Sequence, residues 1–88
     1  MIYIKVHWKH NFQNEPIFLY MELDKNRNEI RKVEIFRNDL LGYAYENINI
    51  NGTFLSKFKI PELCEINEDS QFDAFEIDKE TFELIWNR

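Results

Sequence analysis

Strict alternation of apolar and polar residues opens the chain and constrains its fold more than any other feature. In "MIYIKVHWK", residues 1–9, the even positions are apolar and the odd positions are mostly amphipathic or charged. A period of two places alternate side chains on opposite faces of a β-strand. We therefore predict a half-buried first strand whose core anchors are Ile4, Val6 and Trp8.

Further segments with strand-like patterns follow, separated by short polar turns. Residues 17–24 are apolar or amphipathic on both faces, which suits a central strand. Residues 29–36 break their alternation, which indicates either a bulge or a second amphipathic face. Residues 40–47 predict a fourth strand. Asn51-Gly52 lies between apolar residues and predicts a tight hairpin with a type I′ turn.

The C-terminal residues carry the clearest helix signal. Asp78 can cap a helix, because its carboxylate can accept hydrogen bonds from the free N–H groups of the first turn. Ile77 and Phe82 have the spacing of a hydrophobic staple. Phe82, Ile85 and Trp86 share one helix face, and we expect that face to lie on the sheet.

The remaining segments complete the expected architecture. Residues 60–67 predict one helical turn that starts at Pro61, and residues 72–77 an extended stretch or short strand. A chain of 88 residues suits one domain, residues 1–88. The fold class is therefore expected to be α+β: an antiparallel meander of about four to five strands, packed by a C-terminal α-helix.

Composition limits the class of protein. A hydrophobic fraction of 44% with 16% aromatic residues argues against intrinsic disorder. The single cysteine, Cys64, excludes an intrachain disulfide and favours a reducing compartment; we expect it to be a small, semi-buried apolar residue. The chain has no apolar run long enough for a membrane helix, and its first residues lack the apolar core of a signal peptide. We therefore expect a cytoplasmic protein.

The residue types that carry chemistry form no recognisable catalytic pattern. His7 and His10 are three residues apart, so on a strand they point to opposite faces and cannot chelate one metal. Two glycines leave no phosphate-binding loop. We expect no enzyme activity, no metal and no cofactor. An enzyme that uses His7 or His10 as a general base is kept as an alternative. The role of His10, at the strand end, stays unexplained.

Charge is divided unevenly along the chain. Residues 1–60 hold 9 basic and 7 acidic residues, a net charge of +2, whereas residues 61–88 hold 2 and 9, a net charge of −7. Such asymmetry can steer a charged partner, or the two parts can neutralise each other within one molecule. Basic and aromatic side chains interleaved on a sheet can also bind RNA. The candidates for that are Tyr3, Lys5, His7, Lys9, Arg31 and Arg37.

Three stretches resemble a family of small bacterial domains of unknown function. These are "YIKVHWKH", "EPIFLYMELD" and "RNEIRKVEIF", followed by Phe82 and Trp86 of the closing helix. The resemblance spans nearly the whole chain but implies no activity. One departure from the family pattern is at the turn Asn38-Asp39, where the family pattern has Asp-Gly. Because aspartate takes a left-handed conformation less readily than glycine, we expect the register of that hairpin to be less secure.

The functional expectation combines this resemblance with the charge distribution. Small, acidic, aromatic-rich bacterial domains are often immunity proteins, which neutralise a toxin by covering its active site; this is an argument by association. A nuclease toxin tends to be basic because its substrate is a polyanion, so an acidic surface can steer to it. We therefore expect an immunity protein for a nuclease-type toxin, with a small RNA-binding module as the alternative. The expected contacts are the acidic residues Glu62, Glu65, Glu68, Asp69, Asp73 and Glu76.

A second copy of the chain is a further expected partner. A sheet edge without a neighbouring strand presents unpaired backbone groups, so it can pair with another copy and give a homodimer.

Overall fold

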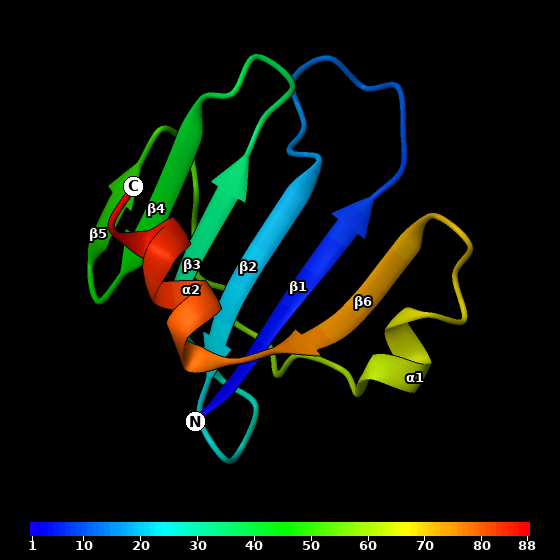
Figure 1. The fold of residues 1–88 in the computed structure, drawn as a ribbon, viewed down its shortest axis with the longest axis vertical. Coiled ribbons are helices and arrows are strands. Elements are labelled where there is room, and N and C mark those ends of the chain that lie inside the picture. Colours follow the sequence, from blue (N-terminus) through cyan, green and yellow to red (C-terminus); the bar gives the residue numbers. More distant parts are fainter.

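A computed structural model of residues 1–88 contains one six-stranded antiparallel sheet with two helices (Figure 1). The strand order across the sheet is β5-β4-β3-β2-β1-β6. Six strands are present, rather than the four to five predicted, because residues 48–50 and 72–77 each pair as an edge strand of the sheet. The elements are β1 (Ile2–Trp8), β2 (Phe18–Leu23), β3 (Glu29–Ile35), β4 (Leu41–Tyr45), β5 (Ile48–Ile50), α1 (Leu63–Ile66), β6 (Phe72–Ile77) and α2 (Lys79–Trp86).

The strands β1 to β5 form a meander, and β6 then joins the edge beside β1. The connection from β5 to β6 crosses the back of the sheet and contains α1, which lies next to β6 (Figure 1). This crossover brings the acidic end of the chain to the first strand. Neither helix has the length and apolarity that a bilayer crossing requires.

The face of the sheet that carries α2 buries one core cluster. Phe82 of α2 is fully buried there, and its ring centroid lies 5.3 Å from that of Tyr3. Asp78 caps the helix, as predicted, because its side chain accepts a hydrogen bond from the Thr81 N–H at 2.7 Å. The buried residues of this cluster are Tyr3, Tyr20, Val33, Ile35 and Phe82.

The opposite face buries the second core cluster beneath the β5–β6 connection. Ile60, Leu63 and Ile66 of that connection pack against it. The predicted burial of Ile4 and Val6 in β1 is confirmed. The buried residues of this cluster are Ile4, Val6, Met21, Leu23 and Ala74.

Two residues are less buried than predicted. Trp8 is only half-buried and belongs to neither core cluster, because β1 ends at this residue. Cys64 is exposed rather than semi-buried, since the single turn of α1 directs its neighbours Leu63 and Ile66 toward the sheet.

The irregularity predicted in residues 29–36 is a β-bulge. Glu22 pairs with Arg31, whereas the next residue of β2, Leu23, pairs with Glu29, so Ile30 has no partner. The extra residue reverses which face the following side chains occupy. Arg31 therefore reaches the same face as α2.

Two hairpin turns contain a residue in the same left-handed backbone conformation. Arg27 and Asp39 each occupy the left-handed region, with φ of 66° and 65°. Each ends a three-residue loop after a type I turn, which is the position that favours glycine. The pairing of Ile35 with Leu41 continues without a register shift, so the Asp39 hairpin keeps a regular register.

The segment around Asn51-Gly52 differs from the prediction. Both residues have positive φ, 56° and 79°, but no strand follows them, so the predicted hairpin is wrong. The chain instead passes over β4, where Thr53 lies against Gly42. A Cβ at Gly42 would meet the Thr53 Oγ1 at 1.9 Å, so only glycine fits there.

Candidate functional site

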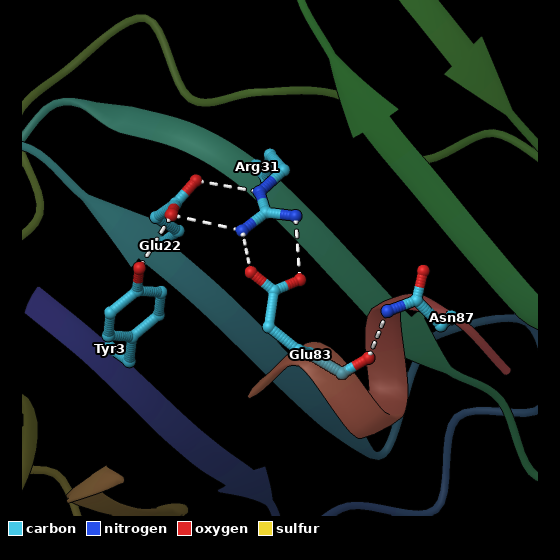
Figure 2. Close-up of polar contacts among 5 residues, drawn as sticks. All are labelled: Tyr3, Glu22, Arg31, Glu83 and Asn87. Atoms are coloured by element: carbon cyan, nitrogen blue, oxygen red, sulfur yellow. Dashed lines mark hydrogen bonds and ion pairs between the residues drawn. The ribbon is translucent and has the colours of Figure 1, made fainter. Parts of the chain in front are cut away.

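A charged network joins α2 to the sheet (Figure 2). Arg31 donates to Glu22 at 2.7 and 3.0 Å and to Glu83 at 3.0 and 2.7 Å. Tyr3 donates its hydroxyl proton to Glu22 at 2.8 Å. Hydrogen bonds from Arg31 hold the pKa of both carboxyls below their usual range, while burial raises the pKa of Tyr3. The network is therefore structural.

This network removes Tyr3 and Arg31 from the predicted RNA-binding face. Tyr3 is 7% exposed, and Arg31 is occupied by two carboxylates and two aromatic rings. Neither side chain can stack on a base or hold a phosphate without dismantling the core. Lys5 stays half-buried, with its Nζ 4.8 Å from the centroid of Phe18.

A second polar cluster lies on the opposite face and anchors the crossing chain. Lys32 pairs with the buried Glu29 at 3.1 Å and donates to the Phe54 carbonyl at 3.1 Å. Thr53 donates to Glu34 at 2.7 Å, and burial raises the pKa of Glu34. Because these side chains bond mainly to the crossing segment, the cluster fixes that segment on the sheet.

His10 has a role that the sequence left unexplained. Its Nδ1 accepts a hydrogen bond from the Phe12 N–H at 2.9 Å, and its Nε2 lies 2.8 Å from the Pro16 carbonyl oxygen. A carbonyl only accepts, so Nε2 carries the proton. Both ring nitrogens therefore hold the β1–β2 loop. His7 instead stacks on Phe18, with ring centroids 4.8 Å apart.

Six acidic residues lie along the β6 edge of the sheet, which we call the acidic edge; by register Asp73 is on the face that carries α2 and Glu76 is on the opposite face. They come from α1, β6 and the residues that flank α1, and these elements lie side by side (Figure 1). All six are exposed. They are Glu62, Glu65, Glu68, Asp69, Asp73 and Glu76.

Most of the acidic edge has no counter-charge within the chain. Glu62 pairs with Arg27 and Asp73 with Lys9, each at 3.4 Å. The other four carboxylates form no ion pair. These four carboxylates are therefore available to pair with the basic groups of a cationic partner.

The acidic edge is held rigidly by side-chain bonds to the backbone. The Asn67 amide donates to the Ala74 carbonyl at 2.8 Å and accepts from the Ala74 N–H at 2.7 Å. At the other end, Arg27 donates to the carbonyls of Ile60 and Pro61 at 2.7 and 2.6 Å. The first contact also occupies the outward backbone groups at the centre of β6, so that sheet edge is not open along its length.

An aromatic cleft that no sequence pattern predicted adjoins this edge. It is a shallow hollow, wide open to solvent, with a volume of about 590 Å³, and it is lined by Trp8, Phe12 and residues 13–15. The ring of Trp8 also contacts Phe72 of β6, with centroids 6.0 Å apart. The sequence signal was three rings within five residues, but only the folded loop turns Trp8 and Phe12 toward one space.

Comparisons with known proteins place the chain in a family but leave its function open. The family model described as Domain of unknown function (DUF6881) matches residues 2–88. No curated protein and no solved structure matches the chain.

Proposed function

Since the protein belongs to this family of unknown function, we propose its function from its own surface: it is a non-enzymatic immunity protein that neutralises a basic, nuclease-type toxin. The observation that carries the proposal is the acidic edge. It presents six exposed carboxylates along one edge of the sheet, and four of them have no ion-pair partner.

The chemistry of a nuclease makes it a fitting partner. An enzyme that holds a polyanion carries basic side chains around its active site. A partner that covers those side chains removes them from water, which costs free energy unless the partner pairs with them. A protein that presents carboxylates in a fixed array steers to that surface quickly and competes with the nucleic acid for it. The acidic edge supplies such an array.

The polar groups elsewhere support a role in binding rather than catalysis. The Arg31 network is closed on itself, and both nitrogens of His10 are engaged by backbone groups. A general base needs a free acceptor that can approach a substrate proton. These groups instead hold α2 and the β1–β2 loop in place.

The proposal is tested with a tagged protein expressed in its source cells. We expect one basic protein to co-purify at stoichiometric yield, and we expect its nuclease activity to fall in proportion to added immunity protein. Enrichment of RNA without such a protein would contradict the proposal and favour a nucleic-acid-binding module. A captured nuclease whose activity is unaffected would contradict the inhibitory role.

Charge reversal identifies the surface involved. The combined change Glu65→Lys and Glu68→Lys should raise the inhibitory concentration at least tenfold, because it reverses two unpaired charges in the acidic edge. Glu46→Lys with Glu80→Lys makes the same change in net charge elsewhere on the exposed surface and serves as the control. Equal inhibition by both double variants would remove the acidic edge as the contact surface.

A further inference from the structure

The aromatic cleft has two ring walls and one carboxylate. The rings of Trp8 and Phe12 have centroids 6.3 Å apart and meet at 61°, so they form two sides of a corner. Glu15 lines the same cleft, is exposed and forms no ion pair. No lysine or arginine lines the cleft. Its only charged side chain is therefore negative.

The cleft is held in shape before any partner arrives. Phe12 is 60% exposed, yet its backbone N–H donates to His10 and its ring stacks on the His10 ring, with centroids 5.2 Å apart. Trp8 is fixed in turn by a hydrogen bond from its Nε1 to the Gln71 side chain at 3.1 Å. An exposed aromatic residue that is already ordered loses little entropy on binding.

The cleft matches a cationic side chain. A guanidinium or ammonium group is attracted to the face of an aromatic ring, tryptophan most strongly, and a nearby carboxylate adds to the attraction. The protein already pairs cations with rings internally: the Arg31 guanidinium lies 4.9 Å from the centroids of both Phe82 and Trp86. The cleft offers aromatic rings and a carboxylate at the surface.

The position of the cleft links it to the acidic edge. Gln71, which holds Trp8, donates its backbone N–H to Asp69 at 2.9 Å. A partner that covers Asp69 at this end of the acidic edge therefore lies close to Trp8. We propose that the cleft receives one arginine or lysine side chain of the basic partner and anchors the complex; this inference rests on the proposed function and identifies its contact.

Two neighbouring cations do not occupy the cleft. Lys9 pairs with Asp73 at 3.4 Å, and Arg37 donates to the His10 carbonyl. Both line a separate hollow beyond Trp8, which a phosphate group would prefer. We therefore expect a polyanion to bind at the hollow that Lys9 and Arg37 line, and a cationic side chain to bind at the aromatic cleft.

The test follows the indole N–H signals of the two tryptophans of the full chain by NMR spectroscopy. A hexa-arginine peptide is the probe, and Trp86, packed between α2 and the sheet, is the internal reference. We expect the Trp8 signal to shift with saturation while the Trp86 signal stays in place. A single-stranded oligouridine that shifts Trp8, when the peptide does not, would overturn the assignment in favour of a nucleic acid.

Variants separate the cleft from the acidic edge. Phe12→Ala and Glu15→Gln change exposed side chains, so the fold is retained, and each should raise the peptide concentration at half-saturation about three- to tenfold. The Glu65→Lys, Glu68→Lys double variant should keep the Trp8 response. If the acidic-edge amides shift and Trp8 does not, the cleft assignment fails while the proposed function stands. If the double variant still inhibits the nuclease fully, the acidic edge fails while the cleft stands.

Discussion

Arg31 of β3 and Glu83 of α2 form a two-bond ion pair, at 3.0 and 2.7 Å, across 52 positions of sequence. The same guanidinium holds Glu22 on the neighbouring strand (Figure 2). Two carboxylates and one guanidinium therefore fix the position of the C-terminal helix on the sheet.

Removing either carboxylate should destabilise the fold, but to different extents. The Glu22 side chain is 8% exposed and that of Glu83 is 31% exposed, so solvent compensates Glu83 better. We expect Glu22→Gln to lower the free energy of unfolding by about 2–3 kcal/mol and Glu83→Gln by about 1 kcal/mol. Urea unfolding measures both, and Glu80→Gln on the exposed side of α2 is the control. The reverse order would contradict the account.

The same carboxylates predict a loss of stability in acid. Hydrogen bonds from Arg31 lower the pKa of Glu22 and Glu83 below 4.5, their ordinary value in the unfolded chain. The stabilisation is thus complete above that value and is lost as the pH falls through the folded pKa. The free energy of unfolding, measured from pH 6 down to pH 2, should fall less in Glu22→Gln than in the wild type. Parallel curves would contradict the prediction.

Glu34 should show the opposite dependence. Burial raises its pKa above 4.5, so ionisation of Glu34 weakens the fold as the pH rises through this range. Glu34→Gln keeps an oxygen that accepts the Thr53 hydroxyl, and it removes the buried charge. We expect this variant to be more stable than the wild type at pH 7 but not at pH 4. An equal difference at both pH values would show that the charge is not the cause.

Asn67 should protect one sheet edge. Asn67→Ala leaves the N–H and carbonyl of Ala74 without partners, which should lower the free energy of unfolding by about 1–3 kcal/mol. The opened edge should also raise self-association in sedimentation experiments. Asn67→Asp is the matched control, because it keeps the acceptor for the Ala74 N–H. A monomeric Asn67→Ala variant of unchanged stability would contradict this role.

The two left-handed turn residues should respond differently to glycine. Asp39→Gly removes the strain of a side chain at φ 65° and should raise the free energy of unfolding by about 1 kcal/mol. Arg27→Gly relieves the same strain but removes the bonds to Ile60 and Pro61 and should therefore be destabilising. Thermal unfolding of both variants tests the pair; a gain in both would show that the Arg27 bonds add nothing.

Local patterns in the sequence predicted the elements but not their long-range partners. The alternation of β1, the bulge near Ile30 and the Asp78 cap depend on neighbouring residues, and each was recognisable. The pairing of β6 with β1 joins residues more than sixty positions apart, and periodicity carries no information on it. The predicted number of strands was therefore too low, and Trp8 was wrongly expected to be a core anchor.

In the candidate site, too, the sequence indicated the residues but not the contacts between distant segments. The six carboxylates were identified from charge alone, and the crossover before β6 brings the segments that carry them to one edge of the sheet. The aromatic cleft depends on the loop that His10 holds, and no spacing rule predicts that loop. Tyr3 and Arg31 were assigned to a binding face because the sequence does not reveal that α2 covers them.

The association rate with the captured basic protein tests the central claim most directly. It is measured at two salt concentrations for the wild type, for Glu65→Lys with Glu68→Lys, and for the control pair Glu46→Lys with Glu80→Lys. The account predicts that the acidic-edge variant associates at least tenfold more slowly at low salt, with a weaker salt dependence, while the control stays close to the wild type. Equal rates for all three proteins would contradict it.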